Sequence, residues 1–283
     1  MQKFFRKIVS ALLVLAITFS SVISALAAES NETNGERTNI NCEKGSIEQF
    51  IGVTKSTRSS GNNFKELIYT YEQDGVNYKV YDQASIDLSS SHSFIYKIDE
   101  NKTEILVREE IVNVENNAVI TTIIENGEET IDVLELDKKN ILDLGSVNET
   151  TSKLLTRGTW DGFPVSNTYK YWKSFKYSYS ITGTTVAAVS VTINAIVKAA
   201  SNLNPVSKIT VTAITSLVSY IVNKNVKRTY VKENVAFRWT EIPNVVLQQK
   251  AVERTIRTFY LDSNYATVID TVTTYAYSKY YED

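Results

Sequence analysis

The sequence predicts an α+β protein, with an acidic antiparallel β-meander in its N-terminal half and an aromatic-rich antiparallel sheet with an apolar helical hairpin in its C-terminal half. Short β-rich runs separated by turn residues follow one another over residues 64–136. Residues 169–179 alternate between aromatic residues and lysine or serine, and two apolar runs joined by a polar hinge fill residues 184–222. Period-two alternation is typical of strands, and apolar residues three or four apart are typical of helices.

The first 27 residues have the pattern of a secretory signal peptide. Three basic residues precede an apolar run over residues 8–23, and Ala25-Leu26-Ala27 follows it. This order of charge, apolar core and small residues predicts export and cleavage after Ala27. The alternative is an uncleaved membrane anchor. We expect a secreted, extracellular protein of a Gram-positive type of bacterium, because the chain is rich in lysine, threonine and tyrosine.

Charge divides the rest of the chain into two parts. Residues 28–156 hold 12 Lys and Arg against 24 Asp and Glu, a net of −12, whereas residues 157–283 hold 15 against 8, a net of +7. We therefore expect a flexible leader (28–62) with one short helix at 46–51, an acidic β-rich domain (63–156) and a basic aromatic-rich domain (157–283). The acidic domain is a candidate pro-region that masks the basic one, with Arg157 as a candidate processing site. Two differently charged solvated surfaces are the alternative.

Turn signals inside the acidic domain support the meander. Asp74-Gly75 and Asn126-Gly127 each separate two β-rich runs, which is a strong hairpin signal. The many acidic residues are expected on the solvent face of these strands. The pair Glu109-Glu110 is therefore expected at a solvated strand end or turn, with no part in catalysis.

The chain offers little for catalysis or metal binding. It has one histidine, His92, and one cysteine, Cys42. One of each cannot form a structural zinc site, and a single cysteine cannot form an intramolecular disulfide. Cys42 is expected in the mobile leader and His92 in a loop. We expect a protein that is not an enzyme, with no cofactor, no metal and no nucleic acid partner.

The two apolar runs decide how the C-terminal half is interpreted. The first follows Gly183-Thr184-Thr185, whose hydroxyls can cap a helix, and has Asn194 and Lys198 on its polar side. The second, 206–222, follows the helix-start signal Asn204-Pro205 and reaches the lower length limit for a membrane-spanning helix, although its β-branched residues disfavour a helix. The residues expected to face the core or a membrane are Val186, Val189, Ile193, Ile196, Val197, Ile209, Ile214, Leu217 and Ile221.

Three interpretations of residues 184–222 stay open. The segment is a helical hairpin buried against the sheet, a hairpin that inserts into a bilayer under some condition, or a pair of strands of the kind that build toxin β-barrels. They are not exclusive, because a hairpin stored in a folded protein can later enter lipid. The expected resting state is the buried hairpin.

The strands of the basic domain combine aromatic and cationic side chains. Twelve of the 17 tyrosines and all three tryptophans lie there. Interleaved rings such as Tyr171, Trp172, Tyr177, Trp239 and Tyr277 suit a membrane interface as well as a core. The side chains expected to contact an anionic lipid or wall polymer are Lys170, Lys173, Lys176, Arg228, Lys232 and Arg238.

Residues 160–283 resemble a known family. A strand with Trp172 and spaced tyrosines, then Gly183-Thr184-Thr185-Val186-Ala187-Ala188, an apolar hairpin and Phe259-Tyr260-Leu261-Asp262-Ser263-Asn264-Tyr265 together look like the large, signal-peptide-bearing bacteriocins of the geobacillin type. The chain departs from them at residues 202–205, where it has no glycine-rich loop. The resemblance implies a secreted antibacterial protein without a cofactor.

The sequence therefore predicts a secreted bacteriocin-like protein that acts non-enzymatically on the membranes of target cells through its apolar hairpin. Its partners would be a bacterial membrane or an anionic wall polymer, and an immunity protein is a further candidate partner. The alternative is a secreted wall- or surface-binding module without killing activity. An enzyme that uses a carboxylate pair is a third hypothesis.

Overall fold

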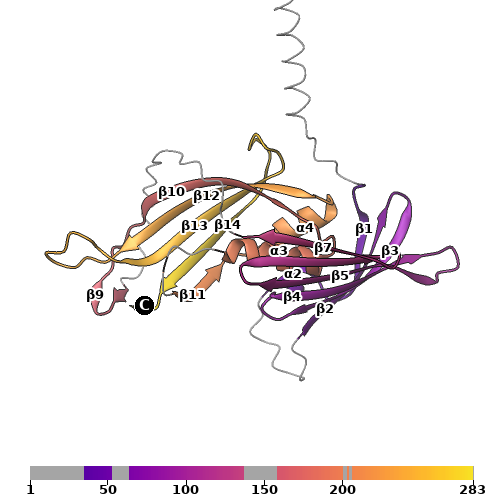
Figure 1. Cartoon of the computed structure of the whole chain (residues 1–283), viewed down its shortest axis with the longest axis horizontal. Helices are drawn as coiled ribbons and strands as arrows, with labels where there is room; N and C mark the ends of the chain where they lie inside the picture. Colours follow the sequence, from indigo (N-terminus) through magenta and orange to yellow (C-terminus); the bar gives the residue numbers. More distant parts are fainter. Residues whose placement is uncertain (1–34, 53–63, 137–157, 200–202, 204–205, 283) are drawn as a thin grey trace, which may run out of the picture. The chain divides into compact units, whose positions relative to one another are not determined.

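The computed structural model describes residues 35–52, 64–136, 158–199, 203 and 206–282, which all belong to one compact unit that starts at Thr33. Of the described residues, 58% lie in strands, which pair antiparallel, and 13% lie in helices, so the fold is mainly β with some helix. Figure 1 shows two large sheets and the helices labelled α2, α3 and α4. The candidate cleavage and processing residues Ala27 and Arg157 lie outside the described residues.

The first sheet, called here the meander sheet, has seven strands in sequence order, each antiparallel to the next. Its turns follow the turn signals of the sequence. Asp74 and Gly75 have φ of 53° and 76°, and Asn126 and Gly127 have φ of 53° and 80°, as a two-residue hairpin turn requires. The predicted β-meander is thus confirmed. Its strands are β1 (Thr38–Lys44), β2 (Phe64–Gln73), β3 (Val76–Ser85), β4 (Ser90–Ile98), β5 (Glu104–Glu115), β6 (Ala118–Glu125) and β7 (Glu128–Glu135).

The second sheet, called here the aromatic sheet, has the strand order β10-β12-β13-β14-β11, with all neighbours antiparallel. Its strands are β10 (Lys170–Ser180), β11 (Val206–Val211), β12 (Arg228–Trp239), β13 (Lys250–Tyr260) and β14 (Val268–Ser278). A small third sheet joins β8 (Thr159–Trp160), β9 (Phe163–Pro164) and β15 (Tyr281–Glu282).

Three helices lie in the described part of the chain: α2 (Ile47–Ile51), α3 (Val186–Lys198) and α4 (Thr215–Asn223). The predicted helix at 46–51 is confirmed as α2, and the hydroxyl of Ser46 accepts a hydrogen bond from the backbone N–H of Gln49 at 3.2 Å. The predicted cap of the first apolar run is confirmed too, because the Thr185 hydroxyl accepts from the N–H of Ala188.

The second apolar run is not the single helix that the prediction of a helical hairpin requires. Residues 206–211 form β11, which pairs with β14, and only residues 215–223 are helical, as α4. The β-branched side chains of Ile209, Thr210 and Val211 explain the change, since they fit a pleated strand better than a helix. The hairpin is therefore a helix, an edge strand and a second short helix.

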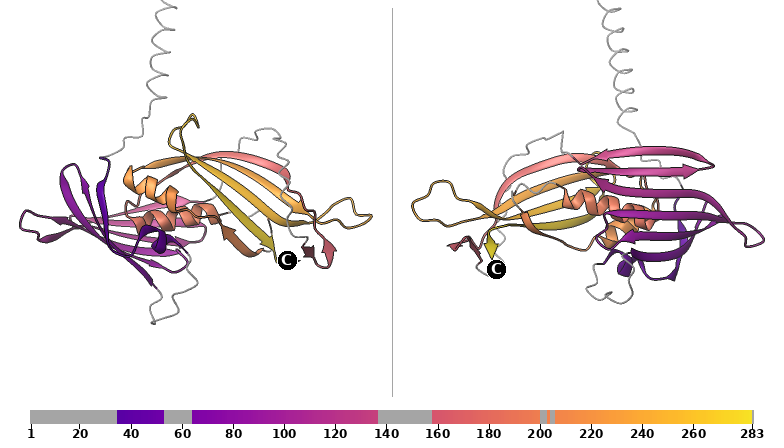
Figure 2. Two further views of the ribbon diagram at one scale, coloured as in Figure 1. Left: turned by 180° about the vertical axis from the view of Figure 1, so that it is seen from behind. Right: turned by 60° about the horizontal axis from the view of Figure 1, so that its bottom comes forward.

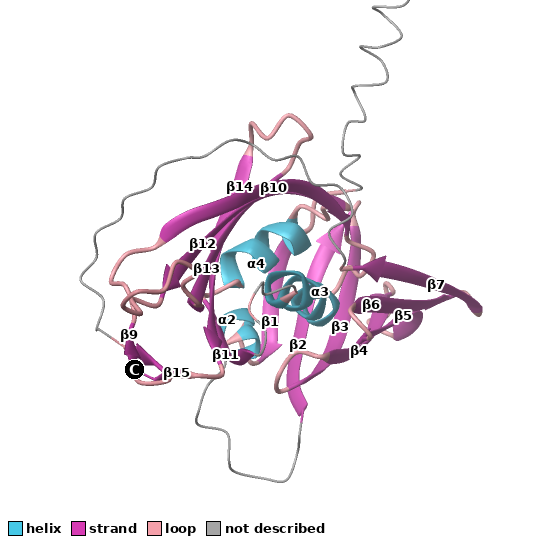
Figure 3. Ribbon diagram, turned by 60° about the vertical axis from the view of Figure 1, so that its left-hand side comes forward, coloured by secondary structure: helices cyan, strands magenta, loops and turns pink. Residues whose placement is uncertain are grey.

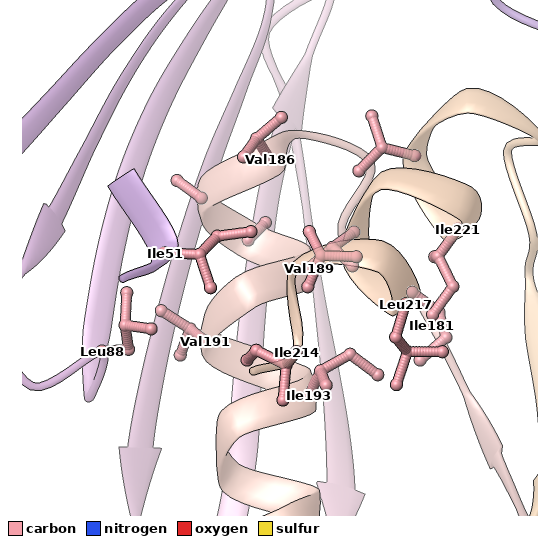
Figure 4. Packing of buried hydrophobic residues seen from close by; sticks show 14 of the residues in the cluster. Ile51, Leu88, Ile181, Val186, Val189, Val191, Ile193, Ile214, Leu217 and Ile221 are labelled. Carbon is pink, nitrogen blue, oxygen red and sulfur yellow. The ribbon is translucent and has the colours of Figure 1, made fainter. Parts of the chain in front are cut away.

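Helix α3 is the centre of the core. It contacts β3, β4 and β5 of the meander sheet on one side, and α4, β11 and β14 on the other (Figure 3). Twelve of its thirteen residues are buried, so Asn194 of its predicted polar side is buried and Lys198 is the one residue that stays exposed. Figure 4 shows Val189 and Ile193 of α3 beside Ile214 and Leu217, and Val191 on the side of Ile51.

Buried acidic side chains of the meander sheet bind the N-terminus of α3. One carboxylate oxygen of Glu110 on β5 accepts from the backbone N–H of Thr184 at 2.8 Å and of Thr185 at 3.2 Å. A carboxylate oxygen of Asp82 on β3 accepts from the N–H of Ala187 at 2.8 Å. These bonds satisfy N–H groups that have no partner within the helix, and carboxylate oxygens are favourable acceptors at the positive end of the helix dipole.

A buried arginine of the aromatic sheet binds the C-terminus of the same helix. The guanidinium of Arg257 on β13 donates to the carbonyls of Val197 at 2.8 Å and Ala199 at 3.0 Å. Its Nε lies 2.8 Å from the Glu233 carboxylate, which also accepts from the Tyr177 hydroxyl at 2.6 Å. The two sheets thus hold opposite ends of one buried helix with charges of the appropriate sign.

Three predictions for the acidic half are wrong. Thr38–Lys44 is not flexible leader but strand β1, so Cys42 lies opposite Tyr69 in the meander sheet, and burial raises the pKa of its thiol. His92 lies within β4 opposite Ile111, with its Nε2 2.6 Å from Glu109. Glu110 is fully buried, because it serves the end of α3.

Candidate membrane-contact site

The two most exposed apolar side chains on the described part of the chain are neighbours in one loop. Residues 240–249, called here the tip loop, connect β12 to β13. The loop projects beyond the end of the aromatic sheet, at the far left of Figure 1 and at the right of the left-hand view in Figure 2. Val246 is 97% exposed, Leu247 79% and Val245 43%. Three adjacent apolar side chains facing water are uncommon on a surface that contacts nothing.

The tip loop is held in shape from within. Its first turn contains Pro243 followed by Asn244 at φ 59°, the backbone that a Pro-Asn turn favours. The side-chain amide of Gln248 then spans the loop. Its oxygen accepts from the N–H of Ile242 at 2.8 Å, and its nitrogen donates to the carbonyls of Ile242 at 3.0 Å and Val245 at 2.8 Å. The exposed apolar side chains are thus presented by an ordered loop.

A cluster of rings and ammonium groups lies at the base of the loop. This cluster, called here the tip cluster, contains Trp172, Lys173, Phe237, Trp239 and Lys250. The Phe237 ring contacts Trp172 and Trp239 edge-on, with centroids 5.3 and 5.7 Å apart. Lys250 Nζ lies 4.0 Å from the centroid of the Trp172 ring and 4.3 Å from that of Phe237. Burial and the nearby Lys173 ammonium lower the pKa of Lys250, while Glu253 opposes this.

All three tryptophans of the chain lie at this end of the aromatic sheet. Trp160 on β8 pairs with Phe163, which is 39% exposed, and residue Val165 bridges to Thr240 at the start of the tip loop. Tryptophan and tyrosine accumulate where proteins meet the headgroup layer, because their rings are apolar and their N–H or O–H is polar. An apolar tip followed by a belt of tryptophan and lysine matches the order of layers in a bilayer interface.

The structure places all but one of the residues expected to face a core or a membrane in the core. Those on α3, on α4 and just before α4 are each at most 5% exposed: Val186, Val189, Ile193, Ile196, Val197, Ile214, Leu217 and Ile221. Ile209 on β11 is the exception at 36%. In the folded protein α3 and α4 are therefore core elements, whereas β11 lies at the surface.

The six cationic side chains expected at an anionic surface do not form one patch. Arg238 is buried at 4% exposure, and it donates to the Ser166 carbonyl and the Tyr281 hydroxyl, so it is not a surface contact. Lys173 belongs to the tip cluster, 5.0 Å from the Trp172 ring. Lys176 and Lys232 lie opposite each other on β10 and β12. Lys170 and Arg228 are exposed near the two ends of the β10–β12 pair.

Two other kinds of site, a metal site and a membrane-spanning helix, are not found among the described residues. None of the groups of His, Cys, Asp and Glu among them is placed to hold a metal ion. No helix within this described part has both the length and the apolar character needed to cross a bilayer. The tip loop and tip cluster combine exposed apolar side chains with rings and ammonium groups, a composition that suits an apolar–polar interface.

Comparisons with known proteins give no relative. No protein-family model matches the chain, and neither a curated protein nor a solved structure matches it. Evidence on function therefore comes from the tip loop and the tip cluster themselves.

The tip loop was missed in the sequence because its apolar content is small. Residues Val245-Val246-Leu247 follow Pro243-Asn244 and precede two glutamines, so they lie between turn and polar residues instead of within a periodic pattern. A Pro-Asn turn that leads directly into an apolar triplet is the signal that could have indicated an exposed apolar loop.

Proposed function

We propose that this protein is a secreted antibacterial protein that acts non-enzymatically on the membranes of target cells, and that the tip loop makes the contact. The observation that carries the proposal is the ordered exposure of Val245, Val246 and Leu247 in front of the tip cluster. Burial of one Val or Leu side chain contributes about 1.5–3 kcal/mol. Two such side chains and a lysine near anionic headgroups, at about 1 kcal/mol, suffice for reversible adsorption.

The fold supports action as one piece rather than by removal of an acidic pro-region. Glu110 and Asp82 of the acidic half bind the N-terminal N–H groups of α3. Loss of the meander sheet would leave these groups without partners and would expose one side of a largely buried, mostly apolar helix to water. The whole protein is therefore the form in which the proposal should be tested.

Vesicle binding tests the proposal. All three tryptophans lie near the tip loop, so their fluorescence should shift to shorter wavelength when anionic phosphatidylglycerol vesicles are added. The double variant Val246→Asp/Leu247→Asp should lower vesicle affinity at least tenfold, because it puts two charges where apolar burial is expected. Val268→Asp is the matched control, since Val268 is 55% exposed at the start of β14. Equal binding by both variants would remove the tip loop from the proposal.

Killing is tested separately. The wild-type protein should release a dye from the same vesicles and inhibit neighbouring bacterial species, and the double variant should lose both effects. Adsorption without dye release or inhibition would leave a surface-binding module and end the antibacterial proposal.

A second candidate function, a wall-binding module, is favoured by the other face of the aromatic sheet. Consecutive residues of a strand point to opposite faces of the sheet. Glu233 lies on the face of β12 that is turned to α3, so Lys232 lies on the face turned away from it. Tyr265 packs against Tyr230 and Tyr260 on the opposite face, with Lys176 Nζ 4.6 Å from its ring centroid. Rings and paired lysines suit an anionic wall polymer. Sedimentation with isolated cell walls that depends on Lys176 and Lys232, but not on Val246, would support this function instead.

A further inference from the structure

A second feature is a cleft of about 600 Å³ that does not involve the tip loop. It lies between the end of α2, the turn from β3 to β4, the last turns of α3 and the segment from β11 to α4. Its apolar walls include Ile51, Leu88, Ile209 and Ile214, and its polar lining includes Asn194 and Lys198. This size and mixture are typical of sites for small ligands.

The apolar walls are incompletely covered by the protein itself. Ile209 is 36% exposed although it lies on the face of β11 that is turned to the core side, and Ile86, at the rim, is 42% exposed. Leu88 and Ile51 behind them are buried at 3% and 5%. The cleft thus continues the apolar core outward to a surface that water covers, and an apolar chain could replace that water.

One end of the cleft carries positive charge. Lys198 Nζ lies 3.4 Å from the carbonyl of Asp87, a long contact for a hydrogen bond. Lys65 Nζ donates to the carbonyls of Phe50 and Gly52 at the end of α2, both at 3.0 Å. Burial lowers the pKa of both lysines, the Lys198 ammonium lowers that of Lys65 further, and the Asp87 carboxylate opposes these effects.

Asp87, which also lines the cleft, cancels only part of this charge. Its carboxylate is engaged by the Ser89 N–H at 3.2 Å and the Ser89 hydroxyl at 2.8 Å. Two ammonium groups and one carboxylate leave a net charge of +1 at the polar end of an apolar cleft. Lys198 and Asp87 both line the cleft, whereas Lys65 does not. Because the Asp87 carboxylate accepts from Ser89, Lys198 is the charged group with which an anion in the cleft would pair.

We propose that this cleft binds a single-chain lipid anion, of which a long-chain fatty acid is the simplest form. The acyl chain lies along Ile51, Leu88, Ile209 and Ile214, and the carboxylate pairs with Lys198. The charge-assisted bond from Lys198 selects the anion over a neutral lipid of the same length. The site is independent of the tip loop, so it stands or falls separately from the proposed membrane action.

Fluorescence titration of the purified protein with cis-parinaric acid, and in parallel with its methyl ester, tests this inference. The acid should bind saturably with one equivalent per chain and about tenfold more tightly than the ester. Lys198→Gln should weaken acid binding about tenfold and leave ester binding unchanged. Ala213→Trp, at an exposed residue of the cleft wall, should abolish binding of both by filling the cleft.

Two controls separate this site from non-specific adsorption. Lys176→Gln removes a lysine on the aromatic sheet and should change nothing, and the thermal unfolding midpoint of Ala213→Trp should equal that of the wild type. A competition with phosphatidylglycerol vesicles distinguishes a free fatty acid from a bilayer lipid as the source of the chain. The inference is overturned by absence of saturable binding, by binding that survives Ala213→Trp, or by equal affinity for acid and ester.

Discussion

Helix α3 and the tip loop contrast in how apolar sequence is used. Helix α3 is mostly apolar and has twelve of its thirteen residues buried, whereas the tip loop has only three consecutive apolar residues and exposes all of them. The difference lies in the partners. The free backbone N–H and C=O groups at the two ends of α3 bond to buried charged side chains on the two sheets. In the tip loop the backbone groups bond to the side chain of Gln248, and the apolar side chains point into solvent. A long apolar run thus indicates a core, and a short one can indicate a contact site.

The largest expected effect comes from breaking the charged end of α3. Arg257→Met leaves Glu233 buried without its guanidinium and two helix carbonyls without donors, so it should lower the free energy of unfolding by about 3–5 kcal/mol. Urea denaturation measures the change. The double variant Arg257→Met/Glu233→Gln should recover part of it, because the uncompensated charge is gone. A loss below 1 kcal/mol for the single variant would contradict the role given to Arg257.

A pair of truncations compares the two regions directly. Ile193→Ala removes a fully buried side chain of α3 and should destabilise the protein by about 2–5 kcal/mol. Leu247→Ala removes a side chain of the tip loop that is already in water, and should change stability by less than about 0.5 kcal/mol. The same two variants should show the reverse order in vesicle affinity. Similar stability losses would show that the tip loop is packed in solution.

The buried carboxylate at the start of α3 predicts a pH dependence. Burial raises the pKa of Asp82 to about 7, and the Ser93 hydroxyl and the Ala187 N–H partly oppose this. The folded state then binds more protons than the unfolded chain between the unfolded value near 4 and pH 7. The contribution of Asp82 to stability is therefore highest in acid and falls as the pH rises toward 7.

Comparison with Asp82→Asn isolates this contribution, since the Asn oxygen can still accept from the Ala187 N–H. From pH 5 to pH 7 the wild type should lose roughly 2–3 kcal/mol relative to the variant, at about 1.4 kcal/mol per pH unit. Urea unfolding at a series of pH values measures it. A constant difference between the two proteins over this range would show that Asp82 does not titrate there.

The smallest effect is expected from the support of the tip loop. Gln248→Ala removes the amide that spans the loop, and should lower stability by only about 1 kcal/mol, because most of the loop polar groups can bond to water instead. Vesicle affinity should nevertheless fall several-fold, since a mobile loop has to be ordered on binding. Gln249→Ala, next to it and exposed, serves as the control. Unchanged affinity in Gln248→Ala would show that loop order does not contribute.

Local signals in the sequence predicted part of the fold well. The Asp-Gly and Asn-Gly turns determine the register of their hairpins within a few residues, and the Thr185 cap acts on its own first turn, so both could be recognised without tertiary contacts. The second apolar run could not, because residues 206–211 fit a strand or a helix until β14 offers an edge for pairing. The burial of Glu110 could not be predicted for a similar reason, since its partners Thr184 and Thr185 are more than 70 residues away along the chain.

The sequence by itself determined strands β2 to β7 of the meander but not β1, and it determined the start of α3, the apolar run around which the core forms and the concentration of tryptophan in the C-terminal half. Tertiary structure alone decided which apolar side chains meet water and which charges are buried. The physical reason is distance along the chain. Propensity, turns and caps act within a few residues, whereas the burial of α3 depends on Glu110 and Arg257, which come from different sheets. The exposure of Val246 depends likewise on where the aromatic sheet ends.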